Sequence, residues 1–212
     1  SQKIQSYFRL AEFLLKEYQP DDRQRLFREY GAFQFLREQG FREVPAPYFK
    51  DQENNYAIYS FENGLVLGAR SLSKAETDQI VSFLTKLHRI KLSKSKGNSF
   101  LESLFATRSL NEFADSVLFK FGKFEESLIS GNLHPKAVQL AEEYPLSELV
   151  KSTIKELRNK ESNTQDIFKP IKPSEKRLSP VDFGPHNMIA RNNGELCFID
   201  FEYFGWDDPV KI

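Results

Sequence analysis

The dipeptide Asn193-Gly194 constrains the fold of this chain more than any other local signal. It lies between two largely apolar runs, Met188–Ala190 and Glu195–Phe201. Asn-Gly is the pair that two-residue hairpin turns favour, because both turn positions need positive φ angles. The sequence therefore predicts a β-hairpin near its end, with Asn187 before the hairpin and Asp200 after it.

Asp182 and Asn187 form the spacing Asp-x-x-x-x-Asn just before this hairpin. In protein kinases, the aspartate of a loop with that spacing accepts the proton of the attacking hydroxyl, and the asparagine binds Mg²⁺. A second acidic residue holds the metal that bridges the ATP phosphates. Asp200 is placed for that role, so the sequence predicts Asp182 as the catalytic residue, with Asn187 and Asp200 as magnesium ligands.

Asp182 also begins an Asp-Phe-Gly tripeptide, which holds magnesium in protein kinases. That alternative requires an Asp-x-x-x-x-Asn loop about one hairpin upstream. The aspartate there, Asp166, is followed five residues later by Ile171, whose side chain cannot bind a metal. The order of the motifs therefore favours the catalytic role for Asp182.

The composition limits the classes of partner. Hydrophobic residues make up 40% of the 212 residues and charged residues 28%, which is typical of a soluble globular chain. Lys and Arg number 30, as do Asp and Glu, so no net charge attracts nucleic acid or an anionic membrane, and we expect neither as a partner. The single cysteine, Cys197, excludes an internal disulfide and lies in an apolar run. We therefore expect a buried, inert thiol and a cytoplasmic location.

The first third of the chain is expected to hold one secure helix. Residues 3–18 contain neither Gly nor Pro and fit both a strand pair and an amphipathic helix. Asp21 or Asp22 could cap the helix that follows, in which apolar residues recur at helical spacing over 26–36. Gly40 is well placed to end that helix.

Other elements follow from local signals along the rest of the chain. The expected elements are an extended segment at 44–49, a strand at 55–64, helices near 74–90, 110–129 and 147–159, a loop at 91–100 and a Pro- and Lys-rich connector at 169–177. Ser71 and Ser73 are expected to open the helix near 74–90.

The last part of the chain resembles the aminoglycoside phosphotransferase and choline kinase family, the small-molecule branch of the kinase-like fold. The residues that carry the resemblance are VDFGPHN, IDFEY and FGWDDP, which together span 181–209. Upstream, FLLKEY resembles the family's lysine strand. The resemblance implies that Lys16 binds the nucleotide phosphates and that Glu29 pairs with Lys16.

The resemblance also implies the architecture and the reaction. The fold is expected to be α+β and bilobal, like a protein kinase, with a β-rich N-terminal nucleotide-binding lobe at 1–63 that holds one helix. A mostly helical catalytic lobe at 64–212 would carry the β-hairpin, and the family pattern implies that this lobe is incomplete. The expected activity is ATP- and Mg²⁺-dependent phosphorylation of a small-molecule hydroxyl, on an aminoglycoside, choline, ethanolamine or sugar-like acceptor. The oligomeric state is left open.

Two departures from the family pattern keep an alternative open. Pro180-Val181 stands where the family has His-Gly, and no glycine precedes Gly31, so the loop that covers the phosphates is missing or degenerate. A catalytically impaired pseudokinase that binds a nucleotide or a partner is therefore the second hypothesis. A protein kinase of the eukaryotic type is disfavoured, because Phe201-Glu202 rather than Phe-Gly follows Asp200.

Overall fold

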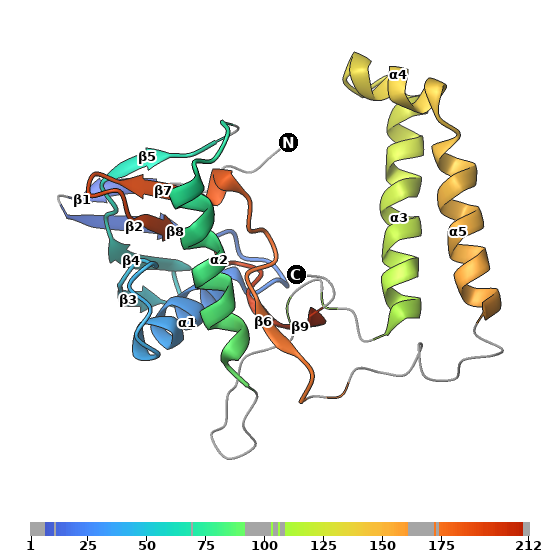
Figure 1. The fold of residues 1–212 in the computed structure, drawn as a ribbon. Coiled ribbons are helices and arrows are strands. Elements are labelled where there is room, and N and C mark those ends of the chain that lie inside the picture. The colour runs from blue at the N-terminus through green and yellow to red at the C-terminus, as the bar shows by residue number, and fades with distance from the viewer. Residues whose placement is uncertain are drawn as a thin grey trace. The chain divides into compact units, whose positions relative to one another are not determined.

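The computed structural model describes residues 7–10, 12–68, 70–91, 103, 106, 109–160, 172 and 174–209. The chain divides into two units, one formed by residues 1–106 and 173–212 and the other by residues 107–172. In the described part of the chain, the strands belong to the first unit, and three helices form the second (Figure 1). The predicted lobe boundary after residue 63 falls inside the first unit and stays a prediction. Residues 92–100 of the predicted loop and part of the 169–177 connector lie outside the described residues.

A four-stranded antiparallel sheet begins the first unit, in the order β1-β2-β4-β3. Its strands are β1 (Tyr7–Leu10), β2 (Phe13–Glu17), β3 (Pro47–Asp51) and β4 (Tyr56–Ser60). In β4, the buried Ala57 and Tyr59 alternate with half-buried residues, as expected for a strand with one face toward the core. Of the two alternatives predicted for residues 3–18, the described residues adopt the strand pair, with β1 at 7–10 and β2 at 13–17.

Helix α1 (Arg25–Glu38) packs against this sheet through one stripe of side chains. The buried members of the stripe recur at steps of three and four residues; they are Leu26, Glu29, Ala32, Phe33 and Leu36. Gly40 ends the helix with a φ of +85°, a conformation that glycine adopts without a steric penalty. The predicted helix and its end are confirmed.

The start of α1 differs from the prediction. The residue before the helix is Gln24, which has a left-handed backbone with φ 54° and makes no side-chain cap, so neither Asp21 nor Asp22 caps it. The carboxylate of Asp21 instead accepts a hydrogen bond from the backbone N–H of Arg23 at 3.0 Å and one from Arg25 at 3.1 Å. A side chain that bonds within its own turn is not available to the helix end.

Helix α2 (Lys74–Arg89) begins with a capping box, which explains why its start could be predicted. The hydroxyl of Ser73 accepts a hydrogen bond from the backbone N–H of Glu76, and the Glu76 carboxylate accepts one from the backbone N–H of Ser73. Two donors that the helix leaves unpaired are thus satisfied.

The predicted hairpin is present and belongs to a second sheet, with the order β5-β7-β8. Strand β7 (Met188–Arg191) pairs with β8 (Leu196–Phe198), and Gly194 in the turn has a φ of +83°. Strand β5 (Gly64–Val66) pairs with β7 on its other side. Segments that are far apart in the sequence therefore share this sheet.

Three short strands were not predicted: β5, which begins where the predicted strand at 55–64 ends, and two strands near the site. Strand β6 (Arg177–Ser179) pairs with β9 (Gly205–Asp207), so the segment that follows Asp200 is held against the one that precedes Asp182. The carboxylate of Asp207 is buried and accepts a hydrogen bond from the hydroxyl of Ser103 at 2.8 Å. Strands of three residues carry too little periodicity to be recognised from sequence.

Phenylalanine rings of α1, α2 and the C-terminal segment meet in the core of the first unit, together with aliphatic residues. The ring centroids of Phe33 and Phe201 lie 5.3 Å apart, and those of Phe83 and Phe198 lie 4.3 Å apart. Cys197 is fully buried in β8, and burial raises the pKa of its thiol above the ordinary value. The prediction of a buried cysteine is confirmed.

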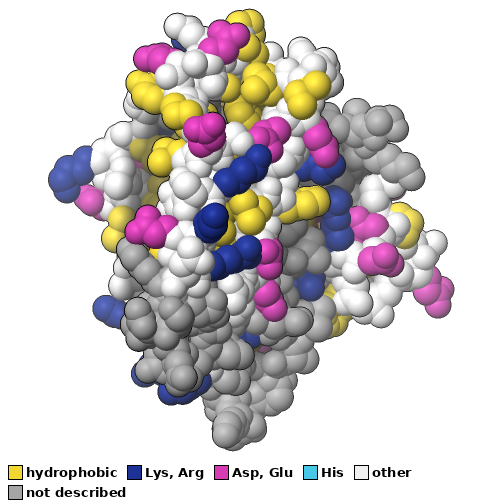
Figure 2. All heavy atoms as spheres, turned by 90° about the vertical axis from the view of Figure 1, so that its right-hand side faces the viewer, with side chains coloured by type: hydrophobic (Ala, Val, Ile, Leu, Met, Phe, Trp, Pro, Cys, Tyr) yellow, Lys and Arg dark blue, Asp and Glu magenta, His cyan; other side chains and the backbone are white. Residues whose placement is uncertain are grey.

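The second unit consists of α3 (Leu110–Ile129), α4 (Pro135–Glu143) and α5 (Leu146–Lys160), of which α4 was not predicted. Helices α3 and α5 pack side by side (Figure 1). Arg158 on α5 forms an ion pair with Asp115 on α3 at 2.6 Å. Basic, acidic and hydrophobic side chains are interspersed on the face of the molecule in Figure 2. Within the described ranges, none of the helices combines the length and the apolar character needed to cross a membrane.

Candidate active site

Lys16 and Glu29 form a buried ion pair between β2 and α1. The Lys16 ammonium nitrogen lies 2.6 Å from Glu29 Oε2, and the two side chains are only 4% and 3% exposed. The Tyr18 hydroxyl donates a further hydrogen bond to Glu29 Oε2 at 2.8 Å. Burial is the largest influence on the pKa of Glu29 and raises it. The charge of Lys16 and the hydrogen bonds from Lys16 and Tyr18 act in the opposite direction, but the pKa stays above its ordinary value. The pair that the family resemblance implied is therefore formed, and both of its side chains are buried.

Asp200, which follows the β7–β8 hairpin, forms an ion pair with Lys16 as well. Its Oδ1 atom lies 2.8 Å from the Lys16 ammonium nitrogen, and its side chain remains 30% exposed. Its backbone has a φ of 64°, a left-handed conformation that is strained for a residue other than glycine. Lys16 thus bridges two carboxylates, and the cluster of one cation and two acidic groups has an excess of negative charge.

Asn187 lies at the end of a short 3₁₀ turn, Pro185–Asn187, and is buried. Its side-chain amide donates a hydrogen bond to the backbone carbonyl of Asp182 at 3.0 Å. Its own backbone carbonyl accepts one from Ile199 at 2.9 Å, across the hairpin. Because the amide nitrogen is engaged, the oxygen of the same side chain is left as an acceptor, which is the atom that a hard metal ion would use.

Asp182 is the most exposed of the predicted site residues. Its carboxylate lies 3.2 Å from His186 Nε2, and the two side chains are 46% and 61% exposed. Gly184 makes room for this contact, because a Cβ atom at that position would lie 2.5 Å from the imidazole ring of His186. The backbone before Asp182 is also unusual, since Val181 has a φ of 67°.

A cleft of about 420 Å³ opens over the buried pair. Its lining includes Lys16, Glu29, Asn187 and Asp200. Asp182 is outside this lining, among the residues that the structure describes, although its partner His186 is part of it. The apolar part of the wall consists of Leu14, Phe33, Phe61, Val66, Ile189 and Ile199. The structure therefore gathers four of the five predicted site residues in one cleft. It places the fifth, Asp182, in contact with His186, which lines the cleft.

The residues present suit a magnesium ion by their chemistry. The Asn187 amide oxygen and the Asp200 carboxylate are the hard oxygen donors that Mg²⁺ prefers, and Mg²⁺ takes its remaining ligands from water and phosphate. The excess negative charge around Lys16 favours a cation at the same place. In the described part of the chain, no three His, Cys, Asp or Glu side chains are grouped as a metal site.

Several residues of the site were not recognised from sequence. Tyr18 holds Glu29, and its hydroxyl lies 2.7 Å from that of Tyr59. Glu62, which lines the cleft, is held by Arg191 of β7 at 2.7 Å. No local pattern marks these pairs, because each joins residues that only the fold brings together.

This combination defines the class of protein. A small sheet with one helix holds a buried Lys–Glu pair, which faces an Asp-x-x-x-x-Asn loop and an aspartate beyond a hairpin, and this is the arrangement of the kinase-like fold. The sequence profile of the phosphotransferase enzyme family matches residues 4–211, and the chain belongs to this family. No protein with a curated description matches it.

Solved structures share the fold. The gentamicin complex of APH(2″)-IIa is 22% identical, with a TM-score of 0.55, and the match covers 98% of this chain and 64% of that chain. The AMP-bound spectinomycin phosphotransferase APH(9)-Ia is 14% identical, with a TM-score of 0.61 and coverage of 94% and 61%. The choline kinase LicA from Streptococcus pneumoniae is 19% identical, with a TM-score of 0.52 and coverage of 97% and 62%. These likenesses confirm the expected α+β kinase-like fold, and this chain spans less than two thirds of the length of each of the three.

Proposed function

We propose that the protein transfers the γ-phosphate of ATP to a hydroxyl group of a small molecule, with Mg²⁺. The observation that carries the proposal is the position of Lys16, which joins Glu29 of α1 to Asp200 in the cleft that Asn187 also lines. Phosphoryl transfer asks the protein chiefly to position its reactants and to neutralise charge, and this cluster provides fixed charges for both tasks.

Each residue of the cluster has a distinct part in the proposal. Lys16 contacts the α- and β-phosphates, and Glu29 fixes its flexible stem in a direction that points into the cleft. Asn187 and Asp200 would hold the magnesium ion, which when bound neutralises charge on the phosphates. The apolar wall of the cleft suits the flat base of the nucleotide.

Asp182 orients the acceptor hydroxyl in this proposal. The acceptor oxygen forms a bond to the γ-phosphorus while the bond from that phosphorus to the bridging oxygen breaks. ADP leaves, and the hydroxyl proton passes to the Asp182 carboxylate. The exposure of Asp182 supports this part, because an acceptor that arrives from solvent must be able to reach it.

The acceptor is proposed by class alone. Among the similar structures, one is a gentamicin complex, one is a spectinomycin phosphotransferase and one is a choline kinase. We therefore propose an aminoglycoside, an amino alcohol such as choline or ethanolamine, or a sugar-like acceptor. A cytoplasmic location, where ATP is available and thiols stay reduced, fits the single buried cysteine.

A second candidate function is that of a nucleotide-binding pseudokinase. The position of Asp182 favours it, because this residue is outside the described cleft lining and its carboxylate is engaged with His186. The retention of Asn187 and Asp200 beside the Lys16–Glu29 pair supports the enzyme instead, since a scaffold has no chemical need for the whole set.

Two measurements test the proposal. ATP consumption by the full chain is screened against aminoglycosides, amino alcohols and sugars, with the variant Asp182→Ala beside it. Turnover on one class of acceptor that Asp182→Ala abolishes supports the enzyme, whereas nucleotide binding without turnover on any acceptor supports the pseudokinase. Calorimetry with ATP should show that Asp200→Ala loses Mg²⁺-dependent binding while Asp182→Ala retains it. Asp78→Ala, an exposed aspartate on α2, is the control, and equal loss in the two site variants would contradict the assigned roles.

A further inference from the structure

Helix α1 is joined to the segment after Asp200 by a second ion pair, outside the cleft. The Arg25 guanidinium donates to both carboxylate oxygens of Glu202, at 3.2 and 3.3 Å, although 177 residues separate the two in the chain. One turn further along α1, Arg28 donates to the backbone carbonyl of Phe204 at 3.3 Å. The first turn of α1 is therefore bound to the residues that directly follow the proposed metal ligand.

The Arg25–Glu202 pair is largely buried, so a charge left there without its partner would be destabilising. The side chain of Glu202 is 6% exposed and that of Arg25 is 17% exposed. Burial lowers the pKa of Arg25, but Glu202 and Asp21 raise it by more, so the guanidinium is held in its charged form. A buried carboxylate that loses its cation keeps the cost of leaving water without the compensating attraction.

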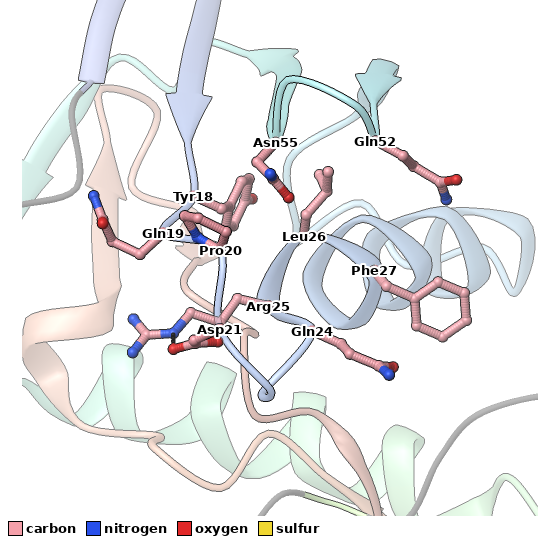
Figure 3. Close-up of a pocket in the computed structure, with 10 residues that line it drawn as sticks. All are labelled: Tyr18, Gln19, Pro20, Asp21, Gln24, Arg25, Leu26, Phe27, Gln52 and Asn55. Atoms are coloured by element: carbon pink, nitrogen blue, oxygen red, sulfur yellow. Dashed lines mark hydrogen bonds and ion pairs between the residues drawn. The ribbon is translucent and has the colours of Figure 1, made fainter.

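Arg25 can serve two carboxylates because of its shape. Its Nε atom donates to Asp21 Oδ2 at 3.1 Å, and its terminal nitrogen donates to Glu202. Figure 3 shows Arg25 and Asp21 together in the wall of a surface pocket of about 260 Å³, next to the start of α1. A lysine is a single point charge and could not hold both partners in fixed directions.

Helix α1 is thus connected to the 200–204 segment twice, once through Glu29, Lys16 and Asp200 and once through Arg25 and Glu202. Glu29 lies one helical turn after Arg25, and Asp200 lies two residues before Glu202, so each connection joins the same two segments. We propose that Arg25 and Glu202 are positioning residues, which fix α1 against the 200–204 segment and so set the distance between the Lys16–Glu29 pair and Asp200. This inference rests on the proposed function, because it gives Asp200 a ligand role.

The test measures Mg²⁺-dependent nucleotide binding rather than turnover, so it needs no acceptor. Calorimetry gives the Kd of ATP with and without Mg²⁺ for the full chain and for Arg25→Met, Arg25→Lys and Glu202→Gln. Each variant is expected to weaken binding in the presence of Mg²⁺ about tenfold, the equivalent of about 1.4 kcal/mol, and to change binding without Mg²⁺ much less. The double variant Arg25→Met/Glu202→Gln should be no weaker than either single one, because both remove the same connection.

Arg23→Met is the matched control, because Arg23 also faces Asp21 but is 47% exposed and lies 3.7 Å from it. Thermal unfolding of every variant shows whether the chain is folded. If Arg25→Met does not fold, the milder variants Arg25→Lys and Glu202→Gln carry the test. Folded variants that bind ATP and Mg²⁺ as the parent chain does overturn the inference, provided that Asp200→Ala weakens the same binding. If Asp200→Ala has no effect either, the proposed function is what fails.

Discussion

The ammonium group of Lys16 lies 2.8 Å from the carboxylate of Asp200, across 184 residues of chain. Glu29 binds the same ammonium from the opposite segment, at 2.6 Å. A single buried cation therefore holds a strand, a helix and the end of a hairpin in one place. The stability of the first unit and its proposed chemistry depend on the same three side chains.

Removal of the Lys16 charge should destabilise the first unit strongly. Lys16→Met leaves Glu29 buried without its cation, and breaking a buried pair in this way costs about 3–5 kcal/mol. Trp206 is the single tryptophan and is 3% exposed in this unit, so its fluorescence during urea unfolding reports the loss.

Lys74→Met is the control for this prediction. Lys74 pairs with Asp78 one turn further along α2, but its side chain is 89% exposed, and such pairs contribute about 0.5 kcal/mol or less. The double variant Lys16→Met/Glu29→Met should recover part of the lost stability, since it removes the unpaired charge. Equal costs for Lys16→Met and Lys74→Met would contradict the prediction.

Gly64→Ala should weaken the pairing of β5 with β7. A Cβ atom at Gly64 would lie 2.2 Å from the carbonyl oxygen of Ala190, and this neighbour is backbone that cannot rotate away. We expect a loss of about 1–3 kcal/mol, seen in the Trp206 transition. Gly122→Ala on α3 is the matched change: nothing lies within 4 Å of its Cβ position, so helix propensity should stabilise α3 by up to about 1 kcal/mol. A neutral Gly64→Ala would show that β5 is not held as the structure has it.

Gly184→Ala should displace His186 from Asp182 with little effect on stability. The added Cβ would lie 2.6 Å from His186 Nδ1, and a half-exposed side chain can rotate away at small cost. Exposed ion pairs contribute about 0–1 kcal/mol, so the unfolding transition should hardly move. The imidazole resonances of His186 in NMR spectra should shift toward those of a free histidine. An unchanged imidazole spectrum would refute the contact.

Acid should destabilise the first unit in part through His88. Burial and the charge of Arg177 lower the pKa of His88 below its ordinary value, and its Nε2 atom is buried with no hydrogen-bond partner among the described residues. The unfolded chain therefore binds the proton more readily. The contribution is complete above the unfolded pKa of about 6.5 and is lost as the pH falls through the lower folded value.

Urea unfolding at several pH values, followed by Trp206, checks this dependence. His88→Gln should flatten the decline in stability between about pH 7 and pH 5. His134→Gln, in the helical unit, should leave the decline as it is. A decline that persists unchanged in His88→Gln would assign the effect to other groups.

Signals that act over a few residues predicted much of the fold. Asn193-Gly194 indicated the hairpin, Ser73 indicated the start of α2, and Gly40 indicated the end of α1, because each satisfies the backbone within its own turn. The start of α1 escaped prediction because Arg23 and Arg25 engage Asp21. Strands β6 and β9 were missed because each finds its partner at a long distance along the chain.

The predicted site residues fall into two groups, according to whether local sequence or the family resemblance indicated them. Asp182, Asn187 and Asp200 follow from spacing around one hairpin, so local sequence was sufficient to name them. Lys16 and Glu29 depended on the family resemblance, because an ordinary lysine and an ordinary helical glutamate carry no local sign of burial. The Arg25–Glu202 pair had no signal at all, since nothing in either segment indicates that the two will meet.

The contact between Lys16 and Asp200 has a consequence for the order in which the protein is made. Lys16 and Glu29 leave the ribosome early and can pair as soon as β2 and α1 form. At about 5–20 residues per second, Asp200 follows roughly 10–40 s later. Until then the nascent chain holds a lysine and a glutamate whose charges nearly cancel, and it lacks the second carboxylate that favours a metal ion. The proposed binding of metal and nucleotide therefore requires that Asp200 has left the ribosome, well after Lys16 and Glu29.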